Sequence, residues 1–576
     1  MRKPAAIVIL AIALGFAALL DGTYSSSSAA PREARNAARL TAALQSLSAG
    51  AEQELRTLLQ SGRLADLQWP SFSDKSEYVK EFYEESGNKL GWIQGGKPTP
   101  QALELIGILE NADEKGLDNK DYDGARWPGR AQALESAGGA AESALVRFDV
   151  ALTVSAIRYI SDLHLGKTDP KVLHKDFDPE QHKHDPGAFL WQNVVGAQSV
   201  KEVLAPVEPQ FPGYKRTEAA LQKYMPLARA EVPDPLPPVE KPVAPGQDYA
   251  GVAKLVRRLQ LFGDLPGSMA VPAGSQTYTP EMASGVKIYQ TRHDLEATGK
   301  LGPETIAQLN TPLSARVEQL RLMLERWRWL PHNFAEPPIV VNIPEFTLRA
   351  YDSQMVPAFN MRVVVGHAMR TQTPVLAEEM KYLIFWPYWV VPPSILRSEI
   401  VPKIAKDPGY LQKENLEVVT YAGQIVTDTV VSEDALAQLR AGKLMVRQKP
   451  GPKNALGLIK FIFPNNDNVY LHSTPSQALF SKERRDFSHG CIRVEDPKKL
   501  AEWVLRNNPG WTQERVEAAF AAQKQEQVNL THPIPVLLVY GTAIVKETGQ
   551  IFFFDDIYGF DNKLEKLFSQ AYASRN

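Results

Sequence analysis

The sequence predicts an α+β protein of several domains, helical on its N-terminal side and mainly β on its C-terminal side, with a small three-helix domain between. Apolar residues recur at helical spacing from about residue 36 to residue 230. Six prolines lie in the thirteen residues from Pro233 to Pro245, which is typical of a stiff linker. From Ile339 onward, short β-branched and aromatic runs alternate with Pro, Asp and Gly, which predicts strands.

Length and composition narrow the classes of function. The 576 residues provide room for about three to four domains. With 64 Lys and Arg against 66 Asp and Glu, the net charge is −2, so the chain lacks the basic excess of a nucleic-acid binder. The single cysteine, Cys491, excludes an intrachain disulfide and any four-cysteine metal site.

The N-terminus predicts export. Arg2 and Lys3 precede an apolar run from Ala5 to Leu20, which is shorter than the roughly 20 residues that span a bilayer comfortably. We expect residues 1–30 to be a secretory signal peptide or, if uncleaved, an N-terminal anchor. The rest of the chain then works outside the cytoplasm, in the periplasm, and membrane contact is confined to this segment.

Residues 36–230 are expected to form a helical scaffold domain, and residues 231–247 the Pro-rich linker after it. The scaffold contains His174, His182 and His184, which admit an interpretation as metal ligands. The prolines near them favour a charged loop instead, because no regular element would hold a metal geometry there.

Residues 248–311 predict a compact three-helix domain. Thr279 and Pro280 supply an N-cap and a proline at the first helical position. The run from Val286 to Asn310 resembles the peptidoglycan-binding domain found beside many cell-wall enzymes. A small structural module that binds no glycan is the alternative interpretation.

Residues 336–545 predict a mainly β catalytic domain, interrupted at 395–446 by a helical pattern typical of an inserted lid. Residues 312–335 predict a helical connector that can pack back on the N-terminal helices. Residues 546–576 remain as a C-terminal segment.

The chemistry-bearing motif surrounds the single cysteine. Cys491 ends the run Ser488-His489-Gly490-Cys491, nineteen residues after His472. A cysteine nucleophile needs a thiolate, which a positioned imidazole produces at neutral pH, and a preceding glycine can turn backbone N–H groups toward an oxyanion. On the residues alone, a small buried cysteine and a three-ligand zinc site with the two histidines remain open.

His472-Ser473, followed by the motif at Cys491, resembles the signature of the L,D-transpeptidase catalytic domain. The resemblance implies a β-rich catalytic domain with a helical scaffold and a peptidoglycan-binding domain, and neither cofactor nor metal. Further stretches are similar to the large, lidded branch of that family: Glu325–Pro331, Val341–Pro344, Val363–Gly366, Trp389–Ser394, Arg447–Gly457, Pro533–Pro535 and Asp555–Gly559.

The resemblance also implies a reaction. Cys491 would attack the carbonyl of the third residue of a peptidoglycan stem tetrapeptide, usually meso-diaminopimelate, and release D-Ala. His472 would take the thiol proton while the backbone carbonyl of Ser473 orients its ring. The N–H groups of Gly490 and Cys491 would stabilise the oxyanion. The side-chain amine of a second diaminopimelate would then form a 3-3 cross-link, and a carbapenem would acylate the same thiol.

Five further residues have roles implied with less support from the motif. His489 is expected to support the Cys491 loop rather than act as the base. Arg493 is expected to contact a substrate carboxylate or, alternatively, to form a salt bridge under the loop. Tyr470 and Trp389 are expected to wall the stem-peptide pocket, and Asn454 to lie near the donor site.

The predicted partners are peptidoglycan stem peptides and glycan, and other cell-wall synthesis enzymes are further candidates. Three functions stay open: a cross-linking transpeptidase, the same acyl-enzyme with water or a wall protein as acceptor, and a non-catalytic wall-binding scaffold.

Overall fold

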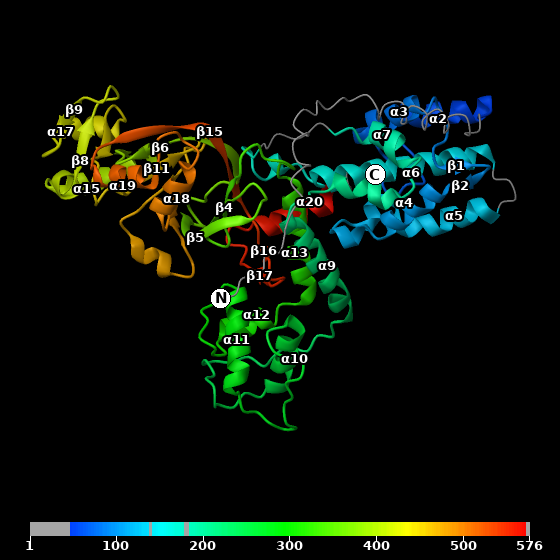
Figure 1. The fold of residues 1–576 in the computed structure, drawn as a ribbon, viewed down its shortest axis with the longest axis horizontal. Coiled ribbons are helices and arrows are strands. Elements are labelled where there is room, and N and C mark those ends of the chain that lie inside the picture. Colours follow the sequence, from blue (N-terminus) through cyan, green and yellow to red (C-terminus); the bar gives the residue numbers. More distant parts are fainter. Residues whose placement is uncertain (1–46, 137–140, 178–183, 572–576) are drawn as a thin grey trace, which may run out of the picture.

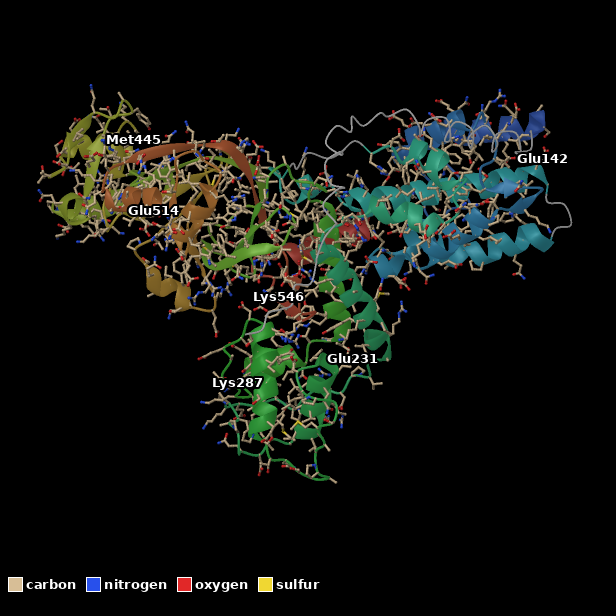
Figure 2. The ribbon with its side chains drawn as sticks, in the orientation of Figure 1. Glu142, Glu231, Lys287, Met445, Glu514 and Lys546 are labelled. Carbon is tan, nitrogen blue, oxygen red and sulfur yellow. The ribbon has the colours of Figure 1, made fainter. Side chains whose placement is uncertain are left out.

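The computed structural model describes residues 47–136, 141–177 and 184–571, so the predicted signal segment and His182 lie outside the described residues. Three arms make up the molecule (Figure 1): N-terminal helices, a three-helix domain and a β-rich region. They meet around helix α13 (Leu313–Arg328). Glu231 and Lys546 lie near this junction (Figure 2). The α+β multidomain prediction is confirmed.

The helical arm is built around α6 (Glu142–Leu165), whose side chains are buried on nearly every side. A helix that is apolar around most of its circumference must lie inside a bundle. Two carboxylates on α6 are satisfied by tyrosines, since Tyr83 donates to Asp149 at 2.6 Å and Tyr122 to Asp162 at 2.8 Å. The other elements of this arm are α2 (Ala49–Ser61), α3 (Ser76–Glu85), β1 (Ile93–Gln94), β2 (Lys97–Pro98), α4 (Pro100–Glu110), α5 (Trp127–Ser136), α7 (Pro186–Phe189), α8 (Val200–Leu204) and α9 (Pro212–Ala230).

The three-helix domain consists of α10 (Val252–Phe262), α11 (Pro280–Arg292) and α12 (Pro303–Leu309). Its core forms where one apolar stripe of each helix meets the others, as the periodicity predicts. Thr279 caps α11 by accepting a hydrogen bond from the Met282 N–H at 3.4 Å.

The β-rich region is organised by a nine-stranded sheet in the order β13-β5-β14-β12-β11-β6-β15-β3-β4. An additional pairing of β4 with β5 closes the sheet into a barrel-like form. The strands are β3 (Ile339–Asn342), β4 (Thr347–Tyr351), β5 (Pro357–Gly366), β6 (Leu376–Phe385), β11 (Ile459–Ile462), β12 (Leu471–His472), β13 (Asp486–Ser488), β14 (Ile492–Val494) and β15 (Glu526–Val539). One face packs against helices α18 (Pro497–Val504) and α19 (Gln513–Ala521) in a single apolar core.

The insertion between β6 and β11 folds as a unit with its own core and a four-stranded sheet, β7-β10-β8-β9. Its first and last strands pair with each other, and in this pairing Trp389 of β7 lies opposite Gln448 of β10. The unit is therefore wider than the predicted 395–446. Its elements are β7 (Trp389–Val390), α14 (Pro393–Ile395), the π-helix η8 (Leu396–Ile400), α15 (Val401–Lys406), α16 (Tyr410–Lys413), β8 (Leu416–Val419), β9 (Ile425–Thr427), α17 (Glu433–Arg440) and β10 (Met445–Gln448).

The C-terminal segment is part of the fold rather than an appendage. The hairpin of β16 (Ala543–Val545) and β17 (Ile551–Phe553) crosses the boundary predicted at 545/546. Helix α20 (Phe560–Ala571) contributes Phe560 and Leu564 to the core of the large sheet. The connector prediction of packing on the N-terminal helices is confirmed, since α13 packs along α9 in one apolar cluster.

Candidate active site

The register of two parallel strands brings the motif residues together. In β12 and β14, Leu471 lies opposite Ile492 and His472 opposite Arg493. Leu471 and Ile492 are fully buried in the core, so the alternating residues point to the other face of the sheet. That face, which we call the catalytic face, carries Tyr470 and His472 of one strand beside Cys491 and Arg493 of the other.

Cys491 is a half-buried, free thiol surrounded by hydrogen-bond donors. The backbone N–H and the hydroxyl of Tyr470 both donate to Sγ. The thiol itself lies 3.8 Å from the Asn468 carbonyl oxygen. Burial raises the pKa of the thiol, while Tyr470, Arg493 and Lys460 oppose this rise. The resting group is therefore a thiol whose thiolate has preformed stabilisation.

His472 is buried on the same face, and its Nδ1 lies 2.6 Å from the Ser473 carbonyl oxygen. This is the orienting contact that the resemblance implied. Burial and the charge of Arg493 lower the pKa of His472 to about 3, so the ring is neutral at physiological pH. With Nδ1–H donating to the carbonyl, Nε2 keeps a lone pair for a proton. In the part of the chain that the structure describes, no hydrogen bond joins this ring to the Cys491 thiol, which lies diagonally across the strand pair.

The turn before Cys491 depends on Gly490, whose φ of 115° favours glycine. Its N–H donates to Ser488 Oγ at 3.1 Å, and Ser488 in turn donates to the Cys491 carbonyl at 2.6 Å. Thr373 fixes the Gly490 carbonyl with a 2.7 Å hydrogen bond. The expectation that the Gly490 N–H points at an oxyanion is therefore wrong for this conformation, because this N–H already donates to the Ser488 hydroxyl. Among the hydrogen bonds of the described residues, none uses the Cys491 N–H.

His489 differs from its expected role. Its ring is half-exposed, and Nε2 lies 2.8 Å from Glu399 Oε1 in the π-helix η8 of the inserted unit. The side chain therefore contacts the insertion and does not brace the Cys491 loop. Bracing comes instead from Ser488 and from Thr371, which donates to the Ser488 carbonyl at 2.9 Å.

Two cations lie on the catalytic face, and sequence reasoning identified one of them. Arg493 has a buried Nε without a hydrogen-bond partner, and it forms no ion pair with any described carboxylate, so the alternative salt bridge is wrong. Lys460, which was missed, lies opposite His472 on β11 with Nζ 5.7 Å from the Tyr470 ring centroid. Burial lowers the pKa of both cations, and the Cys491 thiolate would raise it. A lysine within the apolar strand Lys460-Phe461-Ile462-Phe463 was the available signal.

Two predicted pocket residues make structural contacts. Asn454 is buried, and its Nδ2 donates to the carbonyl oxygens of Pro387, Gln448 and Lys449 at 3.0 to 3.3 Å, while Oδ1 accepts from the Leu456 N–H. Its amide supports its own turn, and this turn lies beside the motif, since the Leu456 carbonyl accepts a hydrogen bond from Ser473 Oγ at 3.2 Å. A substrate contact by Asn454 stays a prediction. Trp389 is half-buried in β7 and packs against the core of the inserted unit.

Metal binding has no support in the scaffold histidines. His174 is buried against Phe560, with ring centroids 4.8 Å apart, and the His184 ring lies 4.4 Å from that of His164 with the ring planes tilted by 36°. Within residues 47–136, 141–177 and 184–571, no group of three His, Cys, Asp or Glu side chains has the arrangement to hold a metal ion. Across the same residues, no helix combines the length and apolar character that crossing a bilayer requires.

Family models match three parts of the chain. "Scaffold domain" matches residues 77–221, "Putative peptidoglycan binding domain" residues 248–309, and "L,D-transpeptidase catalytic domain" residues 337–517. A "Putative L,D-transpeptidase" of Haemophilus influenzae is 32% identical over 250 residues, which are 43% of this chain. The chain spans 49% of the length of that relative. The chain therefore carries an L,D-transpeptidase catalytic domain at residues 337–517, together with matches to a scaffold domain and a peptidoglycan-binding domain.

Proposed function

We propose that this protein is a cysteine-dependent peptidoglycan L,D-transpeptidase that forms 3-3 cross-links outside the cytoplasm. The observation that carries the proposal is the set of groups around one thiol. The Tyr470 N–H and hydroxyl donate to Sγ, Lys460 and Arg493 supply positive charge, and a neutral His472 lies on the same face. These are the groups that a thiolate nucleophile needs.

In the first half-reaction the Cys491 sulfur attacks the carbonyl of the third stem residue. The thiol proton passes to Nε2 of His472, and a C–S bond forms. The Cys491 N–H, which has no partner within the described chain, would then donate to the oxyanion. The C–N bond to D-Ala breaks, and the imidazolium returns its proton to the leaving amine.

In the second half-reaction the side-chain amine of another diaminopimelate attacks the thioester. A C–N bond forms, the C–S bond breaks, and one amine proton returns to the sulfur through His472. Bound partly beneath the inserted unit, the thioester would be shielded from water, which favours the amine as acceptor. The contact of His489 with Glu399 supports placing the insertion over this site.

The unpaired cations indicate how the donor is held. Stem peptides carry carboxylates, and Arg493 keeps a buried Nε without a partner. A guanidinium binds a carboxylate through charge-assisted hydrogen bonds, and binding would satisfy that donor. Lys460 adds positive charge on the same face, which also favours the thiolate.

The deciding experiment is mass analysis of the products that purified protein forms from disaccharide tetrapeptides. We expect a cross-linked dimer and released D-Ala from the wild type, and neither from Cys491→Ala. Met369→Ala, whose side chain is 86% exposed in the neighbouring loop, is the matched control and should retain activity. A carbapenem should add one drug mass to the wild type and none to Cys491→Ala.

Other outcomes identify the alternatives. Trimmed tripeptide without dimer indicates water as the acceptor and an L,D-carboxypeptidase. Dimer formation by Cys491→Ala contradicts the assignment of Cys491 as the nucleophile. Loss of activity on chelation, together with resistance to thiol alkylation, would favour the zinc interpretation.

A further inference from the structure

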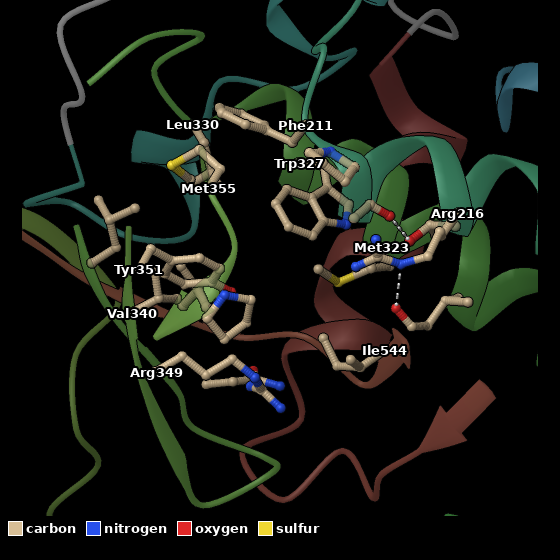
Figure 3. Close-up of a pocket in the computed structure, with 18 of the residues that line it drawn as sticks. Phe211, Arg216, Met323, Trp327, Leu330, Val340, Arg349, Tyr351, Met355 and Ile544 are labelled. Atoms are coloured by element: carbon tan, nitrogen blue, oxygen red, sulfur yellow. Dashed lines mark hydrogen bonds between the residues drawn. The ribbon is translucent and has the colours of Figure 1, made fainter. Parts of the chain in front are cut away.

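A cavity remote in sequence from the catalytic motif lies where the arms of the molecule meet. Its walls come from α9, α13, strands β3, β4 and β15, and the hairpin strand β16. Figure 3 shows Phe211, Trp327, Tyr351 and Ile544 arranged around it. We propose that this cavity is a binding site for a small organic anion, a carboxylate carried on a short alkyl chain.

The walls are mainly apolar, and the volume is about 100 Å³. Aromatic rings of Phe211, Trp327 and Tyr351 and the side chains of Leu330 and Leu537 line it. For comparison, an engineered apolar cavity of roughly 150 Å³ binds benzene. This cavity is smaller than that one, so it suits a short alkyl chain rather than a ring.

Three buried donor atoms, from two residues, lack partners at this cavity. Among the described residues, no acceptor forms a hydrogen bond with Trp327 Nε1 or with Nε and Nη2 of Arg326. Arg326 is only 5% exposed, and its Nη1 alone pairs with Asp561, at 2.6 Å. Unsatisfied buried N–H groups are rare in folded proteins because each loses its hydration without compensation. A ligand that presents acceptor oxygens would satisfy them.

The charge at the cavity favours an anion. Its lining includes Arg216, Arg326, Arg349 and Lys546 but only one carboxylate, Glu547. Arg216 donates a hydrogen bond from Nε to the Val545 carbonyl, and its Nη2 lies 3.4 Å from Glu547. The excess of guanidinium and ammonium groups selects a carboxylate over an alcohol or an amine of the same size.

One carboxylate outside the lining keeps two of these cations in place. Arg349 and Lys546 both contact Glu345. Although burial acts to raise the pKa of Glu345, the two cations lower it to about 2. Because Glu345 stays ionised at neutral pH, it holds Arg349 and Lys546 beside the cavity without neutralising both of them.

A bound anion would contact the scaffold helix, α13 and the catalytic sheet at once. The native state would therefore gain stability with ligand concentration. This site does not depend on the proposed transpeptidation, because no cavity residue belongs to the catalytic face.

The test measures binding of propionate and butyrate to the full-length protein by titration calorimetry and by the shift in thermal unfolding temperature. Butanol and butylammonium provide the same kind of apolar group without the negative charge. We expect both carboxylates to bind at least roughly tenfold more tightly than these controls, since hydrogen bonds to a charged group are the strong ones. Cys491→Ala should bind equally, which separates this site from the proposed activity.

Two variants locate the site. Ile544→Trp fills the cavity and should abolish binding, and Trp327→Phe removes one donor and should weaken it several-fold. Ile425→Trp, on the exposed lid strand β9, is the matched control and should bind as the wild type does. Unchanged thermal unfolding without ligand verifies that each variant folds. No carboxylate binding by the wild type, equal binding of the alcohol or amine, or full binding by Ile544→Trp would each overturn the proposal.

Discussion

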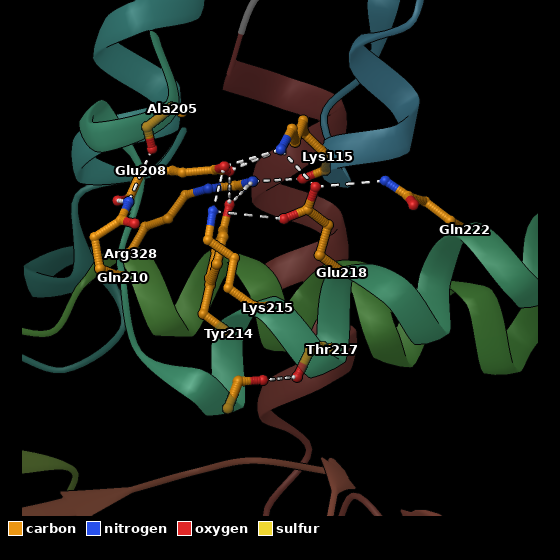
Figure 4. Close-up of polar contacts among 11 residues, drawn as sticks. Lys115, Ala205, Glu208, Gln210, Tyr214, Lys215, Thr217, Glu218, Gln222 and Arg328 are labelled. Atoms are coloured by element: carbon orange, nitrogen blue, oxygen red, sulfur yellow. Dashed lines mark hydrogen bonds and ion pairs between the residues drawn. The ribbon is translucent and has the colours of Figure 1, made fainter. Parts of the chain in front are cut away.

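Charged side chains are partly or fully buried in two regions: the ion-pair cluster of Lys115, Glu208, Lys215 and Glu218 where α9 begins, which we call the junction, and the catalytic face. Only the junction supplies carboxylates for its cations. At the junction (Figure 4), Lys115 lies 2.9 Å from Glu208 and 2.5 Å from Glu218, and Lys215 lies 2.5 Å from Glu208. On the catalytic face, Lys460 and Arg493 pair with no carboxylate of the described chain.

The difference separates two uses of a buried charge. Although burial acts to raise the pKa of Glu208, Lys115 and Lys215 lower it below its usual value, so the folded state favours its ionised form. On the catalytic face, burial lowers the pKa of both cations, and the only anion that would oppose this is the Cys491 thiolate. We therefore expect the charges at the junction to stabilise the folded protein, and we propose that those on the face interact with a reacting or bound anion.

Glu208→Ala should have the largest effect, because it breaks the junction. Its removal breaks charge-assisted hydrogen bonds to Lys115, Lys215 and the buried Tyr214 hydroxyl, so we expect a loss of about 1.5–3 kcal/mol in the free energy of unfolding. The measurement is chemical denaturation followed by circular dichroism. Glu52→Ala breaks an exposed pair with Arg56 on α2 and should cost less than about 1 kcal/mol.

The wild type and Glu208→Ala also provide a pH test of the junction. Because the pKa of Glu208 is lowered in the folded state, its contribution is present above the unfolded value and is lost as the pH falls through the folded value. The wild type should therefore lose more stability on acidification below about pH 4.3 than Glu208→Ala does. Equal losses would mean that the junction charges contribute nothing to folding.

The sequence predicts the large features of the fold because they follow from local periodicity. Helical spacing and short β-branched runs separate the arms correctly, and the N-cap at Thr279 is visible in the chain. The limits of the inserted unit were missed because they depend on a long-range pairing, Trp389 with Gln448, which no local pattern reveals. The hairpin that crosses residue 545 was missed for the same reason.

The candidate site divides in a similar way. Motif spacing identifies Cys491 and His472, and the strand register places both on one face. Whether a polar group serves the backbone or a ligand depends on packing, so the contacts of the Asn454 amide within its own turn and of the Gly490 N–H with Ser488 could not be predicted from the motif. Lys460 joins the face only through the pairing of β11 with β12.

Arg493→Met should have the next largest effect, and it sharpens the comparison. Because Arg493 pairs with no carboxylate in the described protein, its removal leaves no carboxylate unpaired, and the free energy of unfolding should stay equal or rise slightly. Acylation by a stem tetrapeptide should slow by roughly 10- to 100-fold, since a hydrogen bond to a charged group contributes about 1.5–3 kcal/mol. The measurement is kcat/KM for D-Ala release, with unfolding of the same sample.

The matched control for this variant is Arg506→Met, an arginine stacked on Trp503 away from the motif. It should leave kcat/KM unchanged. A destabilised Arg493→Met protein with normal kcat/KM would assign Arg493 to folding and remove the distinction between the two regions.

Tyr470→Phe should have the smallest effect, confined to the pH dependence of the thiol. Burial raises the pKa of Cys491, and the Tyr470 hydroxyl opposes this by donating to the sulfur. Its loss should raise the thiol pKa further, because the thiolate loses one hydrogen-bond donor.

Alkylation by neutral iodoacetamide reports this pKa directly, because Cys491 is the only cysteine of the chain. The rate should follow the thiolate fraction, so the profile of Tyr470→Phe should lie at higher pH than that of the wild type. The control is Tyr421→Phe, which removes an exposed hydroxyl of the inserted unit that donates to the Gly442 carbonyl. Superimposed profiles for all three proteins would show that the hydroxyl does not stabilise the thiolate, leaving that task to Lys460, Arg493 and the Tyr470 N–H.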